Sequence, residues 1–214
     1  MQLKRYYILT LFFIGLLWVF SLYAATPADT LAQLFTATQT MQADFTQTIF
    51  DNHGKSIQRS QGHMAFQRPG KFRWDVRSPL PQLVVANGQR LWIYDADLEQ
   101  VVIRSLHQSA GETPALLLSR PNPVLQTDFK VSEGQGDNKG MQWFILTPKK
   151  NDNMFEQIRL GFRQEQIQAM RLTDHLGHST LIEFHHIHIN TALSSSLFSF
   201  VPKSGVDVID ETQR

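Results

Sequence analysis

One arginine, Arg68, falls on the apolar face of a predicted strand, where a charged side chain is unexpected. In the segment from Ser60 to Arg68 the even positions Gly62, Met64 and Phe66 are small or apolar, and Arg68 shares their parity. A guanidinium stays protonated in proteins, so burial without acceptors would be costly. Two interpretations remain open. Arg68 either points to solvent at a strand end beside Pro69, or reaches across a cavity mouth to backbone carbonyls at a helix end.

Three histidines form the second polar group of interest. His185, His186 and His188 lie in a segment with strand character, where His186 and His188 would share a face. Two imidazoles on one face are able to bind a metal ion. The sequence places no third ligand beside them, so a solvated or strand-packing role is favoured and no metal site is predicted.

Motifs for catalysis are absent from the sequence. It contains no Gly-x-Ser-x-Gly, no His-Glu-x-x-His and no phosphate-binding loop. Its 214 residues include no cysteine, which excludes disulfides, thiolate metal sites, a cysteine nucleophile and a lipid-modified N-terminal cysteine. The formal net charge of +1 gives no nucleic-acid footprint. We therefore predict a protein that is not an enzyme, has no cofactor and binds no nucleic acid.

The N-terminus has the pattern of a secretory signal peptide. Lys4 and Arg5 precede an apolar run from Ile8 to Phe20, and cleavage is expected after Ala24 or Ala25. The alternative is a retained anchor, but the run is shorter than the roughly 20 residues that span a bilayer. We predict a signal peptide at 1–24 and a single domain at 25–214, outside the cytoplasm.

Apolar periodicity predicts the elements that position these side chains. Leu31, Leu34 and Phe35 have helical spacing within 26–40, and a shorter helix with Thr113 as N-cap is expected within 111–120. Alternation of apolar and polar residues, clearest around Phe72, predicts strands elsewhere. The expected strands are 41–49, 60–68, 71–77, 82–86, 89–95, 99–105, 128–132, 141–147, 153–162, 166–173, 179–189, 197–201 and, as a terminal addition, 206–209.

A meandering sheet of this size is expected to curl on itself, with the apolar parity lining its concave face. The sequence supplies only two helical segments to fill that face. Either aromatic side chains fill the interior or a hydrophobic ligand does, as in other small barrels.

Several segments, in a specific order, resemble the outer-membrane lipoprotein carrier family, LolA. The resemblance covers nearly the whole chain after residue 25. It rests on Met41–Gln47 (MQADFTQ), Arg68–Trp74 (RPGKFRW), Val85–Asp95 (VANGQRLWIYD), Leu98–Gln100 (LEQ) and the Phe198, Phe200, Pro202 segment.

The resemblance implies a mainly β (α+β) fold. This is an incomplete, strongly curled antiparallel β-barrel of about 10–12 strands, with an N-terminal helix and a short inserted lid helix over an apolar cavity. The implied protein is a monomeric periplasmic chaperone for acylated lipoproteins. It would receive them from an inner-membrane lipoprotein-releasing ABC transporter and deliver them to an outer-membrane receptor. That receptor shares the fold but needs an N-terminal cysteine. The sequence has no cysteine, which favours the carrier over the receptor.

Residue roles follow from the same resemblance. Arg68 matches an arginine that hydrogen-bonds lid carbonyls, expected here around Leu118 and Ser119 and also on the first helix. Phe72 matches a position implicated in docking to the transporter. The expected lipid cavity is lined by Leu34, Phe45, Met64, Phe66, Trp74, Leu83, Val85, Leu91, Ala115 and Leu118.

Three alternatives remain beside the lipoprotein carrier. One is a related periplasmic module that binds free lipids or glycolipids. Another is a lipid-hydrolysing enzyme that uses a histidine, although no nucleophile is placed for it. The third is a scaffold whose barrel is packed solid by its own side chains.

Overall fold

The computed structural model describes residues 25–106, 114–120, 127–136, 140–150 and 154–212. The predicted signal peptide and Thr113 lie outside these residues. The strands form one twelve-stranded sheet in the order β12-β6-β5-β4-β3-β2-β1-β11-β10-β9-β8-β7. No helix in the described part of the chain is both long and apolar enough to cross a bilayer.

The elements follow one another as a long meander. Their bounds are α1 Pro27–Ala37, β1 Thr40–Phe50, β2 Ser56–Gln67, β3 Lys71–Ser78, β4 Gln82–Asn87, β5 Arg90–Asp95, β6 Gln100–Ser105, the 3-10 helix η1 Pro114–Ser119, β7 Phe129–Gly134, β8 Gln142–Pro148, β9 Phe155–Arg163, β10 Gln166–Asp174, β11 Ser179–Ile189, the 3-10 helix η2 Ser195–Phe198 and β12 Asp207–Asp210.

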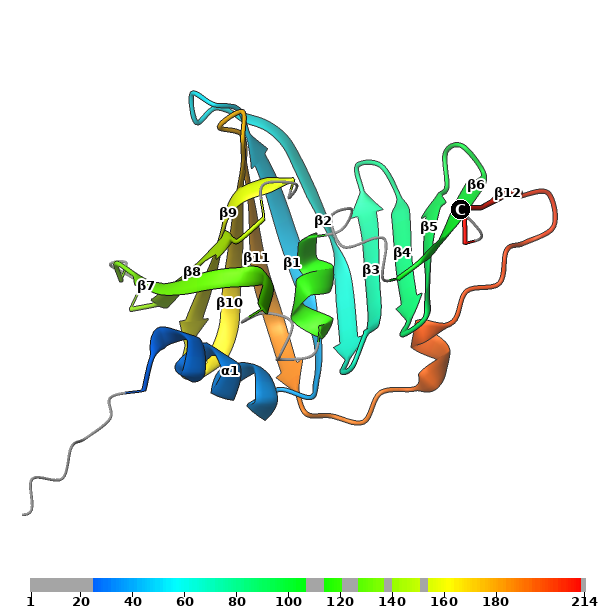
Figure 1. The fold of residues 1–214 in the computed structure, drawn as a ribbon. Coiled ribbons are helices and arrows are strands. Elements are labelled where there is room, and N and C mark those ends of the chain that lie inside the picture. Colours follow the sequence, from blue (N-terminus) through cyan, green and yellow to red (C-terminus); the bar gives the residue numbers. More distant parts are fainter. Residues whose placement is uncertain (1–24, 107–113, 121–126, 137–139, 151–153, 213–214) are drawn as a thin grey trace, which may run out of the picture.

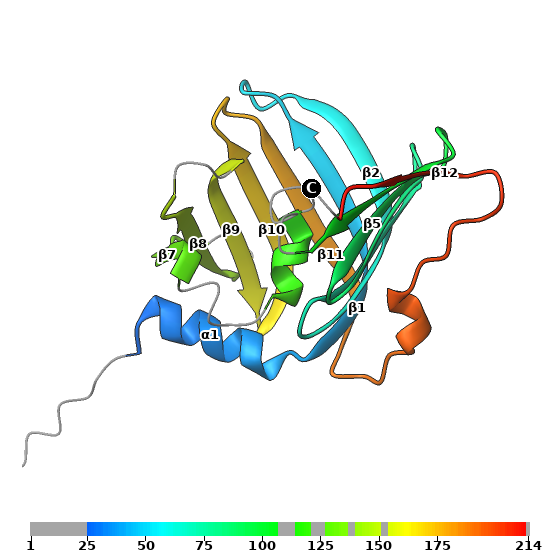
Figure 2. The same ribbon diagram turned by 45° about the vertical axis from the view of Figure 1, so that its right-hand side comes forward.

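The sheet is strongly curled but open, with β7 and β12 as its two edges (Figures 1 and 2). Helix α1 lies along one rim and η1 lies on the concave side, against β2 and β3. The turns β1–β2 and β10–β11 lie at the opposite rim from α1. The curled, open sheet predicted from the sequence is confirmed, and the pairings among β1 to β11 are antiparallel.

Helix α1 begins on clear local signals. Thr26 and Asp29 form a reciprocal capping box, and Pro27 occupies the first helical turn. Leu31, Leu34 and Phe35 form its buried face, as their spacing predicts. The helix ends three residues earlier than expected because β1 already starts at Thr40.

The sheet and both covering segments share one apolar core. Residues 115–118 of η1 are all buried, with exposed fractions between 1% and 7%. They pack in the same cluster as the buried face of α1 and the concave side chains of most strands. The inner face is therefore covered from two sides by the protein's own helical segments.

A smaller apolar cluster lies on the convex face of β4, β5 and β6. It contains Val85, Trp92, Val101 and Ile103, and the C-terminal segment covers it through Phe200 and Val206. β12 then pairs with β6 in parallel, against the expected all-antiparallel pattern. The strand predicted at 197–201 is wrong, because the chain there forms η2 and then an irregular strap that places the Phe200 ring 5.5 Å from that of Tyr94.

Gly62 allows close side-chain packing in the core. A Cβ atom at this position would lie 2.0 Å from the Asp75 carbonyl oxygen and 2.8 Å from Cζ of Phe45. Without that atom, the Phe45 ring stacks on Trp74 with 3.6 Å between ring centroids.

Replacing Gly62 with alanine should therefore lower the free energy of unfolding by about 3 kcal/mol, because β2 and β3 must separate to admit the methyl group. Urea denaturation measures the change. Gly136→Ala is the control, since a Cβ there makes only an ordinary 3.5 Å contact. Equal stabilities for the two variants would contradict the packing described.

Candidate functional site

Arg68 joins the end of β2 to both segments that cover the sheet. Its Nε donates a hydrogen bond to the carbonyl oxygen of Thr38 at 2.9 Å, and Nη1 donates to the carbonyl oxygen of Arg120 at 2.7 Å. Thr38 is the C-cap of α1, and Arg120 directly follows η1. The guanidinium thus reaches carbonyls at two helix ends and does not point to solvent.

Two aromatic rings complete the surroundings of the guanidinium. Its carbon Cζ lies 4.5 Å from the ring centroid of Phe35 and 5.1 Å from that of Phe66. Burial lowers the pKa of Arg68 to about 10, so the group remains charged at neutral pH. The two carbonyls, the ring faces and the negative end of the α1 dipole offset part of its desolvation cost.

The acceptors differ from those expected around η1. The side-chain bond goes to Arg120, whereas the Ser119 carbonyl accepts the backbone N–H of Gly70 at 2.9 Å. Leu118 contributes only a buried side chain, 1% exposed. The prediction of Leu118 and Ser119 as acceptors for Arg68 is wrong by one residue, because the Arg120 N–H closes the helix on Leu117 and leaves the Arg120 carbonyl facing the guanidinium.

Eight of the ten predicted cavity residues lie together in the main core. They are Leu34, Phe45, Met64, Phe66, Trp74, Leu91, Ala115 and Leu118, none more than 9% exposed. In the described conformation they pack against one another. Space for a ligand among them therefore stays a prediction that requires the covering segments to move.

Leu83 and Val85 are corrections to the predicted lining. Trp74 pairs with Val84 across β3 and β4, so Val84 faces the interior and its neighbours face outward. Val85 is buried in the convex cluster, and Leu83 packs against the same cluster. Both faces of β4 are apolar, so alternation alone could not show which parity points inward.

Phe72 is also placed differently from its expected role. Its side chain is 0% exposed, and its ring centroid lies 6.2 Å from that of Trp74. In this conformation Phe72 is a core residue, and its ring is not accessible to a transporter.

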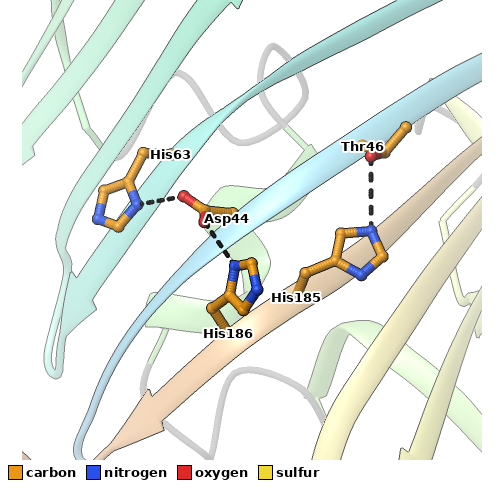
Figure 3. A network of polar contacts seen from close by, with 5 residues as sticks. All are labelled: Asp44, Thr46, His63, His185 and His186. Carbon is orange, nitrogen blue, oxygen red and sulfur yellow. Dashed lines mark hydrogen bonds and ion pairs between the residues drawn. The ribbon is translucent and has the colours of Figure 1, made fainter.

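Two histidines, His63 and His186, contact the carboxylate of Asp44, as Figure 3 shows. Asp44 Oδ1 lies 3.1 Å from Nδ1 of His63, and Oδ2 lies 2.8 Å from Nδ1 of His186. His185 Nε2 lies 3.4 Å from the hydroxyl of Thr46.

A bulge at His186 explains this arrangement. The residue has a positive φ of 50°, and the register between β1 and β11 shifts at this point. The strand alternation is interrupted, so His185 and His186 both reach side chains on the same face of β1. Within the described residues, no group of three or more His, Cys, Asp or Glu side chains is arranged to hold a metal ion.

An open, curled sheet whose apolar inner face is covered by helical segments defines a half-barrel class of protein. Within that class, residues 36–201 match the family model for the outer membrane lipoprotein carrier protein LolA. The chain belongs to this family.

Curated relatives with the same description align over most of their length. The outer-membrane lipoprotein carrier protein of Legionella pneumophila (strain Corby) is 42% identical over 202 residues, 93% of this chain and 98% of the relative. That of Dechloromonas aromatica (strain RCB) is 41% identical over 187 residues, 87% of this chain and 89% of the relative.

Solved structures support the fold alone. A LolA-superfamily protein from Nitrosomonas europaea superimposes with a TM-score of 0.51 at 12% identity, covering 83% of this chain and 99% of the other. An uncharacterized conserved protein from Thermus thermophilus gives a TM-score of 0.53 at 12% identity, with 85% and 99% covered.

Substituting Arg68 with lysine should lower the free energy of unfolding by about 1–3 kcal/mol. A lysine keeps the charge but lacks the planar guanidinium fork, whose Nε and Nη1 donate to the Thr38 and Arg120 carbonyls from two separate nitrogens. Urea denaturation measures the loss. Arg77→Lys, at the exposed end of β3, should change stability by less than about 0.5 kcal/mol. Matching losses for the two variants would show that the two-carbonyl contact contributes little.

The histidine contacts predict a pH dependence for Asp44. Hydrogen bonds from His186 and then His63 hold the pKa of Asp44 below its ordinary 3.8. A carboxyl with a depressed folded-state pKa contributes stability above its unfolded value and loses it as the pH falls through the folded value. The stability difference between wild type and Asp44→Asn should thus be present above pH 3.8 and shrink below it. Thermal melting from neutral to strongly acidic pH checks this, and a gap that widens on acidification would contradict it.

Proposed function

We propose that this protein is a periplasmic chaperone that shields the acyl chains of lipoproteins between the curled sheet and its two covering segments. It accepts the lipoprotein from an inner-membrane ABC transporter and delivers it, as a monomer, to an outer-membrane receptor. Membership of a carrier family supports this role, and it also favours a non-enzymatic function. The observation that carries the proposal is the Arg68 contact to both covering segments.

The described conformation is interpreted as the closed, empty form. Residues 115–118 of η1 and the buried face of α1 occupy the apolar surface that acyl chains would need. When η1 separates from the sheet, the concave side chains of β1, β2 and β3 become available to a ligand. The acyl chains then take the place of the η1 side chains against the apolar face of the sheet.

Arg68 sets the balance between the closed and the loaded form. Burial of an acyl chain is worth about 0.8 kcal/mol per CH₂ group, so a carrier without an opposing term would hold its cargo too tightly. Opening costs the hydrogen bonds of Arg68 and subtracts from the apparent affinity. A receptor without such an opening cost then takes the lipoprotein from the carrier.

We expect the Arg68→Leu variant to retain its cargo, because the balance between the closed and the loaded form shifts toward the loaded form. The variant removes the donor that stabilises the empty form while leaving the apolar surface intact. Two charge-assisted hydrogen bonds are lost, so transfer to the receptor should slow by at least about tenfold. The measurement is transfer of a diacylated lipoprotein from purified carrier to purified receptor.

Arg77→Leu serves as the matched control, because Arg77 lies at the exposed end of β3. It should transfer cargo at the wild-type rate. Near-ultraviolet circular dichroism confirms that both variants are folded. Unimpaired transfer by a folded, loaded Arg68→Leu variant would overturn the proposed role of the arginine.

A further inference from the structure

The concave face changes from apolar to polar at the rim opposite α1. At this rim Gln47 pairs with Ser60 across β1 and β2, and Val76, Gln82 and Asp95 form a row across β3, β4 and β5. Phe45 and Val76 both pair with Gly62, and Trp74, Val84 and Ile93 form the next row inward on the same face. The interior thus ends in a row of mainly polar groups.

A pocket of about 190 Å³ occupies this polar end of the interior. Loop residues 79–81 between β3 and β4 form one wall, and Leu80 is 62% exposed at the rim. The complete lining is Gln47, Gln58, Ser60, Val76, Pro79, Leu80, Pro81, Gln82 and Asp95.

The glutamine amides in this pocket are available for a ligand. Among the described residues, the side chains of Gln47, Gln58 and Gln82 have no hydrogen-bond partner. Asp95, in contrast, already accepts the backbone N–H groups of Asp97 and Leu98 through Oδ1, at 3.0 and 3.1 Å. Each free amide offers both a donor and an acceptor, which is the pattern that a peptide backbone needs.

The stacked rings of Phe45 and Trp74 separate this pocket from the deeper core. Phe45 precedes Gln47 by two residues on β1, and Trp74 precedes Val76 by two on β3, so the ring pair lies directly beneath the polar row. Acyl chains fit the apolar core on one side of the ring pair. The polar group that joins these chains to a polypeptide fits the glutamine-lined pocket on the other side.

We infer that this glutamine-lined pocket binds the backbone of the first one or two residues of the polypeptide attached to the lipid. The inference rests on the proposed function, because the pocket has meaning only if acyl chains occupy the interior. Ligand sites commonly have volumes of about 300–1,000 Å³, so the pocket is too small for a whole lipid. It lies where the cargo must change from apolar chains to polar peptide.

The test compares two ligands with the same acyl chains. One is a synthetic dipalmitoyl-cysteinyl pentapeptide and the other is dipalmitoylglycerol, which lacks the peptide. Binding is measured by displacement of a fluorescent fatty acid from the full-length mature protein. Gln47→Leu and Gln82→Leu should each weaken lipopeptide binding by about five- to tenfold, the effect of one lost hydrogen bond with a buried partner. Their affinity for dipalmitoylglycerol should be unchanged.

Gln61→Leu is the matched control, since Gln61 is exposed and lies on the convex parity of β2. It should bind both ligands like wild type. Equal weakening for both ligands, or no weakening of the lipopeptide in folded variants, would overturn the peptide site while leaving the carrier function in place. If wild type binds neither ligand, the proposed function itself fails.

Discussion

A sheet that curls without closing leaves an apolar inner face that something must cover. Here α1 and η1 cover it, and Arg68 is the polar side chain that binds the C-terminal ends of both. The hydrogen bonds of the guanidinium fix where the two helix ends lie against the sheet, whereas the surrounding apolar contacts contribute most of the energy of burial. Without these hydrogen bonds the two covering segments would be held to the sheet mainly by apolar contacts that an acyl chain reproduces equally well.

The Arg68 contact combines an unfavourable desolvation of the charge with favourable hydrogen bonds and ring contacts. A small net stabilisation of this kind is what a carrier needs. Desolvation disfavours the charged arginine and lowers its pKa, while the carbonyls of Thr38 and Arg120 and the ring of Phe35 favour it. Each carbonyl accepts its own hydrogen bond, so movement of either Thr38 or Arg120 away from the guanidinium removes one of the two bonds. The proposed carrier role requires such a balance, because the closed form must cover the apolar face and still open when cargo binds.

Alternation predicted most strands because most of them are polar on one face, as around Phe72. It failed where that asymmetry is missing. β4 is apolar on both faces, so only its pairing with β3 shows that Val85 points outward. The bulge at His186 and the strap at 197–201 depend on contacts with distant strands. Spacing placed Arg68 on the apolar parity of β2 but left open whether it points to solvent or reaches helix-end carbonyls, and its acceptor at Arg120 depends on how η1 ends.

Hydrogen–deuterium exchange with and without a saturating diacylated lipopeptide tests the central claim most directly. The amide of Gly70 bonds the Ser119 carbonyl, so its exchange reports on the closed position of η1. The account predicts that ligand binding accelerates exchange at this amide while β1 and β2 remain protected. Bound lipopeptide with unchanged protection at Gly70 would contradict it, because the ligand would then occupy some other surface.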